Sequence, residues 1–388
     1  MPDAVEDLQD LKSGFFADRP QGSLSLPARC YTEPRYLAAE QRAVFHKTWQ
    51  FVCHEETLAA KGDYIAFDVQ GMSLFAIKGA EGNLQAFYNV CRHRAHELLR
   101  GQGNVKAITC PYHGWNYRLD GSLRAARRSE LIENFDTSSF CLKPVRIEVF
   151  CHLVFVNLDP DARPLAELSQ GLGDEVESYA PDIGDLTHAH RITYEIQSNW
   201  KNVVDNFLEC YHCPIAHRDF VSLVDMESYK VTTHGIYSSH MARAGLQENT
   251  AYDVSEAAVT DHAVWWLWPN VCLLRYPGDG NLMVLNIVPT GPETTFETYD
   301  FYFTDKEPTD QQWEALGYVD QVLQKEDIDI VESVQRGMRT PAYDRGRYMT
   351  DPQGGGLSEH GVHHFHSLVL EAYEADLKSA DPRSAAAQ

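Results

Sequence analysis

Two short segments each offer one thiol and one imidazole for binding a metal. Cys91 and His93 form a C-x-H motif, and Cys110 and His113 form a C-x2-H motif after 16 intervening residues. Such a set can hold zinc, or a Rieske 2Fe–2S cluster in which two histidines replace two cysteines on one iron. Zinc fingers usually place both cysteines on one turn and both histidines on a helix. Because each segment here carries one residue of each kind, the spacing favours the two-iron cluster.

A second group of metal-binding residue types lies in the middle of the chain. The apolar pattern predicts a helix over about 200–211, whose polar stripe holds Asp205, Glu209 and His212 at i, i+4 and i+7. His217 follows in the next turn. A lone polar stripe is usually just solvated. With an electron-carrying cluster upstream, an iron(II) site of two histidines and one carboxylate becomes the better explanation.

The carboxylate of such a site must come from elsewhere in the chain. Asp327 lies on the apolar stripe of a helix predicted over Gln311–Met338, with a possible break near Lys325, whereas Asp329 lies on its polar stripe. A buried aspartate is costly unless it is paired or binds a metal. Asp327 is therefore the predicted third ligand.

The elements around these residues predict an α+β protein of two domains. Short strand patterns separated by turns occupy the first part, and long strand patterns with two helices occupy the second. The predicted strands are Tyr64–Phe67, Ser73–Ile77, Leu84–Val90 and Ala107–Tyr117, then Arg191–Ile196, Val271–Tyr276, Leu282–Val288 and Thr295–Phe303. A helix is predicted over Tyr36–Trp49. The predicted division is an N-terminal segment over 1–45, an all-β domain over 46–158, a catalytic domain over 159–380 and a disordered tail over 381–388.

Composition excludes several functions. The 388-residue chain has a net charge of -23, which argues against a general nucleic-acid binder or a protein of anionic membranes. No apolar run approaches the roughly 18 residues of a membrane span. The acidic N-terminus does not resemble a signal peptide.

Nine cysteines, an odd number, predict reduced thiols and a cytoplasmic protein. Cys210 and Cys213 form a C-x2-C pattern that imitates a redox motif, but without a βαβ context they are expected simply to pack. Four histidines between His360 and His366 are expected to belong to an amphipathic C-terminal helix.

The two cysteine–histidine segments, Cys91–Arg94 and Cys110–Trp115, resemble the cluster loops of the Rieske non-heme iron oxygenases. The string Asn206–His212, followed by His217, resembles the acid-x2-His-x4-His pattern of the same family, and Glu326–Gly337 resembles its third-ligand helix. The resemblance implies an N-terminal all-β Rieske domain and a helix-grip catalytic domain, in which an antiparallel sheet surrounds a long helix. It also implies two cofactors per chain: one Rieske 2Fe–2S cluster, held by Cys91, His93, Cys110 and His113, and one mononuclear Fe(II), held by His212, His217 and Asp327.

The resemblance further implies how electrons reach the iron. Family members are trimers or multiples of trimers, in which the cluster of one subunit serves the iron of the next. Glu209 matches the bridging acid, which is expected to bind His212 of its own chain and His113 of the neighbouring subunit. Asp205 and Asn206 are further candidate catalytic residues on the same stripe, and Asp205 is the alternative bridge.

A separate NAD(P)H-dependent reductase of flavin or ferredoxin type is expected, because the chain has no G-x-G-x-x-G dinucleotide site. Residues 91–130 hold eight bases against three acids, which could receive an acidic ferredoxin-type domain. A solvated face partly used in trimer contacts explains that segment about as well.

Within the family, the chain resembles the carnitine monooxygenase branch, whose members act on quaternary ammonium compounds. The matching segments are Asn199–Asn206, Glu209–Cys213, Val331–Gln335 and Ser358–Gly361. Trp265, Trp266, Trp268 and Tyr276 could bind such a cation through their aromatic faces, or could simply be core residues. The expected reaction is O2-dependent C–N cleavage or demethylation of a betaine-like substrate. The alternatives are an aromatic-ring-hydroxylating dioxygenase acting on an aromatic acid, and an electron carrier or zinc-stapled structural protein.

Overall fold

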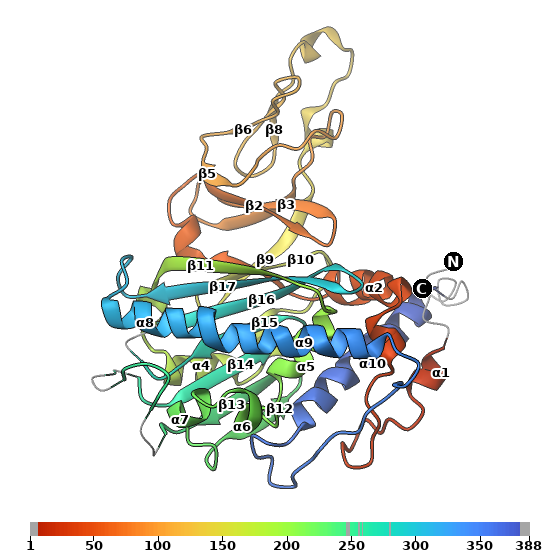
Figure 1. The fold of residues 1–388 in the computed structure, drawn as a ribbon. Coiled ribbons are helices and arrows are strands. Elements are labelled where there is room, and N and C mark those ends of the chain that lie inside the picture. The colour runs from red at the N-terminus through yellow and green to blue at the C-terminus, as the bar shows by residue number, and fades with distance from the viewer. Residues whose placement is uncertain (1–6, 246–248, 255–256, 258, 279–280, 381–388) are drawn as a thin grey trace. The chain divides into compact units, whose positions relative to one another are not determined.

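The computed structural model describes residues 7–245, 249–254, 257, 259–278 and 281–380, and its chain divides into two compact units. One unit is Phe45–Glu167, and the other combines Met1–Val44 with Leu168–Gln388 (Figure 1). The expected disordered tail over 381–388 falls outside the described residues. None of the described helices is long and apolar enough to cross a bilayer.

The unit Phe45–Glu167 is built from antiparallel strands. A seven-stranded sheet has the order β1-β10-β9-β4-β3-β2-β5, and a three-stranded sheet has the order β6-β7-β8. The strands are β1 Gln50–His54, β2 Asp63–Val69, β3 Met72–Lys78, β4 Leu84–Tyr88, β5 Gln102–Asn104, β6 Ile108–Thr109, β7 Asn116–Tyr117, β8 Leu123–Ala125, β9 Pro144–Phe150 and β10 Leu153–Asn157. The strand predicted over Ala107–Tyr117 is wrong in its middle, because residues 110–115 leave the ladder as a loop between β6 and β7. That loop carries half of the predicted cluster ligands.

The larger unit contains a second seven-stranded antiparallel sheet, in the order β11-β17-β16-β15-β14-β13-β12. Its strands are β11 Thr187–Ile196, β12 Lys230–His234, β13 Tyr237–Ala242, β14 His262–Leu267, β15 Val271–Arg275, β16 Asn281–Gly291 and β17 Thr294–Phe303. Two helices, α8 Asp310–Tyr318 and α9 Gln324–Met338, lie over one face of this sheet (Figure 1). Between them, Val319–Leu323 forms a π-helical turn, so the predicted break is real but begins before Lys325. The two units confirm the α+β class.

A helix α5, Trp200–Phe207, packs against both β16 and α9. The Asn199 side chain caps its start by accepting a hydrogen bond from the Lys201 N–H at 2.9 Å. The predicted helix over 200–211 is wrong at its C-terminal end, because the chain turns after Phe207 and restarts as α6, Cys213–Ala216. Glu209 and His212 therefore do not share a helical face with Asp205.

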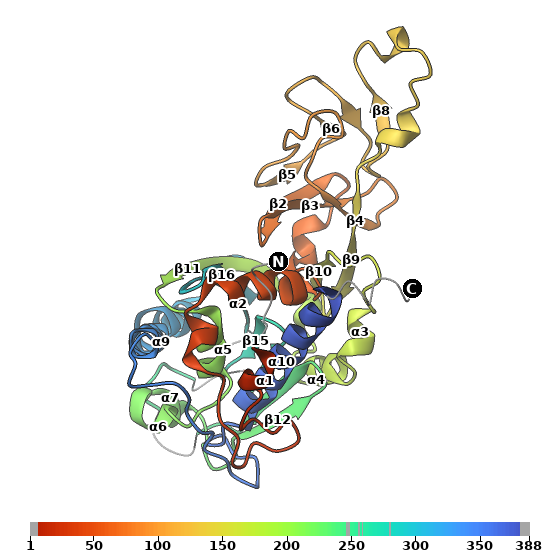
Figure 2. The ribbon, with the colours of Figure 1, turned by 90° about the vertical axis from the view of Figure 1, so that its right-hand side faces the viewer.

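The N-terminal segment packs on this larger unit, beside the C-terminal helix α10, His360–Ala380 (Figure 2). Its helices are α1 Leu8–Leu11 and α2 Pro34–Glu40. The helix predicted over Tyr36–Trp49 is therefore shorter than expected, because α2 is followed by a π-helical turn at Gln41–Phe45 before β1. Further short helices of the chain are α3 Leu165–Leu168, α4 Leu172–Tyr179 and α7 Phe220–Leu223.

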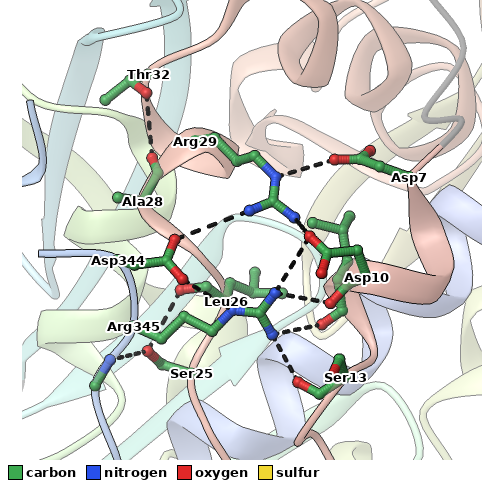
Figure 3. Close-up of polar contacts among 12 residues, drawn as sticks. Asp7, Asp10, Ser13, Ser25, Leu26, Ala28, Arg29, Thr32, Asp344 and Arg345 are labelled. Atoms are coloured by element: carbon green, nitrogen blue, oxygen red, sulfur yellow. Dashed lines mark hydrogen bonds and ion pairs between the residues drawn. The ribbon is translucent and has the colours of Figure 1, made fainter. Parts of the chain in front are cut away.

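Ion pairs and hydrogen bonds of charged side chains stabilise the N-terminal segment at two places. Arg29 pairs with Asp7 and Asp10, while Arg345 donates to the carbonyl oxygens of Asp10 and Ser13 (Figure 3). In the interior, the fully buried Lys201 and Glu40 form an ion pair at 2.6 Å, which ties α2 to α5. A buried charge that loses its partner is strongly destabilising, so this pair holds the N-terminal segment against the helix that precedes the candidate iron ligands.

Candidate metal centres

The first candidate centre is formed by two loops with the same backbone pattern. Cys91 N–H donates to the His96 carbonyl at 2.9 Å, and Cys110 N–H donates to the Trp115 carbonyl at 2.8 Å. Four residues after each cysteine, a backbone N–H returns to the cysteine carbonyl from a left-handed residue, Ala95 or Gly114. The two loops thus share the backbone pattern around the cysteine, although His93 follows Cys91 by two residues and His113 follows Cys110 by three.

The side chains of these loops converge. His93 Nδ1 and His113 Nδ1 lie 3.2 Å apart, and His93 stacks on Trp115 with 4.9 Å between ring centroids. Cys91 and Cys110 are buried beneath them in the hydrophobic core of the unit. Two inner thiols and two outer imidazole nitrogens match the donor set of a Rieske 2Fe–2S cluster.

Removing one of these ligands is expected to destroy the cluster selectively. Cys91→Ala and His113→Ala should each bleach the visible absorption of the cluster while the mononuclear iron stays bound, because the two centres use different side chains. Iron analysis and absorption spectra of the purified variants measure both effects. Cys141→Ala, which changes a free cysteine of the same unit, should keep the wild-type spectrum. A normal Rieske spectrum in either ligand variant would contradict the assignment.

The second candidate centre lies in the larger unit. His212 Nε2 is 3.1 Å from His217 Nε2, and His217 Nε2 is 3.0 Å from Asp327 Oδ1, so these three atoms can face one ion. Each imidazole uses its other nitrogen to contact a carboxylate: His212 Nδ1 lies 2.5 Å from Glu209, and His217 Nδ1 lies 2.8 Å from Glu326. Such contacts orient metal-bound imidazoles. The set fits a mononuclear iron held by two histidines and one carboxylate, with open positions.

Charge around His217 supports cation binding. Burial alone would lower the pKa of His217, but the hydrogen bonds and charges of Asp327 and Glu326 overcome burial and raise the pKa to about 9. The pocket therefore favours a positive charge at this place, whether a proton or a metal ion. The contact of Glu326 with His217 was not predicted from the sequence.

A cavity of about 80 Å³ lies next to the second centre. Five aromatic side chains line it from different elements: Phe207, Phe220, Tyr229, Tyr276 and Tyr299. Glu297 of β17 also lines it, although the sequence did not single it out. Burial, together with the negative charge of Asp327, raises the pKa of Glu297 to about 8.

The remaining predicted site residues lie in different places. Asn206 Nδ2 is 3.4 Å from His212 Nε2, so Asn206 lies beside the centre. Asp205 instead accepts a hydrogen bond from Tyr31 at 2.7 Å and contacts His366 Nε2 at 2.8 Å. Its carboxylate is therefore engaged away from the three converging atoms.

Of the four aromatic residues predicted to bind substrate, only Tyr276 lines the cavity. Trp265 and Trp266 are neighbours on β14, and successive strand residues point to opposite faces. Trp265 accordingly contacts Glu175 and Tyr179, whereas Trp266 and Trp268 pack against Phe365 of α10. The expectation that these tryptophans line the pocket is wrong, since they belong to the core.

Cys210 and Cys213 are joined by a disulfide, which corrects the expectation of two reduced, merely packing thiols. Their Cα atoms lie 4.9 Å apart, within disulfide range, with Cys210 between α5 and α6 and Cys213 at the start of α6.

Comparison with known proteins gives matches over both units. The family model "Rieske [2Fe-2S] domain" matches residues 48–136, and the model "Ring hydroxylating alpha subunit (catalytic domain)" matches residues 183–375. The carnitine monooxygenase oxygenase subunit of Escherichia coli (strain K12) is 40% identical over 361 residues, covering 92% of this chain and 96% of that protein. The chloroplastic choline monooxygenase of Beta vulgaris is 31% identical over 362 residues, covering 92% of this chain and 78% of that protein.

A solved structure gives a similar result. It is that of a quaternary ammonium Rieske monooxygenase, described in terms of carnitine oxidation and inter-subunit electron transfer. It superposes with a TM-score of 0.86 at 35% identity, covering 92% of this chain and 98% of the other.

Proposed function

Because this chain belongs to the Rieske non-heme iron oxygenases, in the branch that includes the carnitine monooxygenase oxygenase subunits, we propose that it oxidises a quaternary ammonium or betaine-like compound with O2. Its cofactors are those of the family, one Rieske 2Fe–2S cluster and one mononuclear iron. We assign the cluster to Cys91, His93, Cys110 and His113, and the iron to His212, His217 and Asp327.

The composition of the cavity wall carries the substrate proposal. The wall combines aromatic rings with the carboxyl groups of Glu209, Glu297 and Asp327, and no arginine or lysine is among its described lining residues. A quaternary ammonium group binds aromatic faces through cation–π attraction and is favoured by nearby acids. An aromatic acid carries a negative charge and has no ammonium group to offset it against these three acids, so this wall disfavours the alternative of an aromatic-acid dioxygenase.

The reaction follows from the chemistry of such a substrate. When bound, the mononuclear iron supplies the O2 chemistry that converts a C–H bond next to nitrogen into C–OH, consuming O2, two electrons and two protons and releasing water. The hydroxylated product then loses its hydroxyl proton, the C–N bond breaks, and a carbonyl compound and a tertiary amine result. The protein holds the cation against the aromatic rings of the cavity. Glu209 and Glu326 contact Nδ1 of His212 and His217 and so orient the Nε2 atom of each imidazole toward the iron site.

Electron delivery requires partners. We propose a homotrimer in which Glu209 connects His212 with His113 of the neighbouring subunit, and the relative described with inter-subunit electron transfer supports this arrangement. We further propose a separate NAD(P)H-dependent flavin or ferredoxin-type reductase, received by the basic residues near the cluster loops. We also propose a cytoplasmic location, supported by the seven of nine cysteines that form no disulfide, Cys91 and Cys110 of the proposed cluster among them.

A substrate panel tests the proposal. With a compatible reductase and NAD(P)H, the protein is expected to release a tertiary amine from at least one of carnitine, γ-butyrobetaine, choline or glycine betaine, and to leave benzoates unchanged. Chromatographic measurement of amine and carbonyl products, with NAD(P)H consumption as a check on coupling, gives the readout. Oxidation of benzoates with inert quaternary ammonium compounds would favour the aromatic-acid dioxygenase.

A further inference from the structure

One histidine in the cavity wall has no partner in the fold. His262 begins β14, lines the cavity beside the second centre and is only 2% exposed, yet neither Nδ1 nor Nε2 makes a hydrogen bond. A buried polar group without a hydrogen bond costs free energy, so nearly all such groups in proteins find partners. An unpartnered imidazole facing a cavity is therefore set to bind something that enters the cavity.

The surroundings of His262 leave it neutral and leave no competitor for its nitrogens. Its ring packs among Phe220, Tyr229 and Tyr276, at centroid distances of 5.6, 5.5 and 5.0 Å. Burial lowers its pKa to about 3, so the ring carries one N–H donor and one acceptor nitrogen.

The adjacent strand offers a comparison. His240 of β13 is as buried as His262 and lies on the same face of the sheet, since Val264 pairs with His240. His240 is not among the residues lining the cavity, and its Nε2 contacts the Ser238 hydroxyl at 3.0 Å. The fold thus gives His240, outside the cavity, a hydrogen-bond partner, and gives none to His262, inside the cavity.

Away from His262, the same cavity wall carries an acidic side chain, Glu297. Glu297 lies on β17, which is separated from β14 by two strands, and its side chain lies on the same inward face as His262. One oxygen of Glu297 accepts a hydrogen bond from Gln324 Nε2, and an ammonium group near the other oxygen would favour the ionised carboxylate, whereas the neutral N–H of His262 suits an oxygen atom. The cavity wall therefore has one end suited to a cation, at Glu297, and another suited to an oxygen atom, at His262.

We propose that His262 binds the oxygen-bearing end of the substrate, its hydroxyl or carboxylate, while the ammonium group lies toward Glu297 and the aromatic rings. This inference rests on the proposed function, because it presumes a quaternary ammonium substrate. His262 then acts as a specificity residue: it favours cations that carry an oxygen group over alkyl cations of the same size.

Matched ligand pairs test this role. Choline and ethyltrimethylammonium differ by one hydroxyl, and γ-butyrobetaine and butyltrimethylammonium differ by one carboxylate. Calorimetric Kd values for the iron-loaded enzyme without O2 should favour the oxygenated member of at least one pair. His262→Phe, which keeps a ring but removes both nitrogens, should weaken that member by about 10-fold and leave the alkyl cation almost unchanged.

Two further variants separate recognition from stability. His262→Gln keeps a donor and an acceptor and should restore part of the preference. His240→Phe, which changes the matched histidine outside the cavity, should affect both members of a pair equally. Equal affinity of the wild type for both members of each pair, or equal weakening of both by His262→Phe, would overturn the inference while leaving the proposed function standing. Failure of the wild type to bind or oxidise any quaternary ammonium compound would instead overturn the proposed function.

Discussion

Replacing Glu209 with alanine is expected to lower product formation by about 100-fold while both metal centres remain loaded. Glu209 contacts Nδ1 of His212 at 2.5 Å, and one of its oxygens also accepts the His212 backbone N–H at 3.2 Å. If the same carboxylate reaches His113 of the neighbouring subunit, it is the connection through which electrons cross between chains. Without it, a reduced cluster cannot deliver its electron to the iron.

A single-turnover experiment measures this effect directly. The cluster is reduced, substrate and O2 are added, and cluster reoxidation is followed by absorption. Glu209→Asp should be intermediate, because the shorter side chain reaches only one imidazole unless the backbone moves. Glu227→Ala, at an exposed glutamate outside the cavity, is the control and should behave as wild type.

Reoxidation of Glu209→Ala at the wild-type rate, with normal product yield, would show that the bridge does not exist. Asp205, the alternative bridge, would then have to break its contacts with Tyr31 and His366 to replace it. The iron content of Glu209→Ala must be measured in the same samples, since loss of iron would give the same loss of product.

Asp327→Ala is expected to lose the mononuclear iron and all measurable turnover, while the Rieske spectrum stays normal. Its Oδ1 lies 3.0 Å from His217 Nε2 and 3.7 Å from His212 Nε2, so it completes the three-ligand set. Asp329→Ala is the matched control, two residues along α9 with an exposed side chain, and should be nearly silent. Iron analysis and turnover of the two variants, side by side, give the result; equal losses would mean that the wrong aspartate had been assigned to the iron.

Residue type and spacing were enough to predict side chains that the structure brings close together at each candidate centre. The cluster residues lie in two short loops, where local sequence sets the backbone pattern, and the structure brings all four together. His212 and His217 are also close in sequence. Asp327 was chosen over Asp329 because it lies on the apolar stripe of its helix, and in the structure the Asp327 side chain is partly exposed and faces His217, whereas Asp329 is exposed.

The end of α5 and the position of the tryptophans depend on contacts between distant segments, and for these features the local sequence pattern gave wrong predictions. The apolar stripe of 200–211 continues past the place where the chain leaves the helix, so the turn at Phe207 and the Cys210–Cys213 bond were not foreseen. The tryptophans of β14 were expected in the pocket because aromatic content says nothing about which face of a sheet a residue occupies, or how far along the strand the cavity extends.

The sequence by itself determined the family, the two metal centres and the α+β class, because metal ligands require particular residue types at short spacings and regular strands and helices leave periodic patterns. Only the tertiary structure decided which side chains line the cavity beside the second candidate centre. The cavity wall is assembled mainly from α5, α7, β14, β16, β17 and α9, whose residues are far apart in the chain. Whether His262 finds a hydrogen-bond partner, or whether Glu297 faces a cation, depends on the packing of all these elements at once, and no local pattern records it.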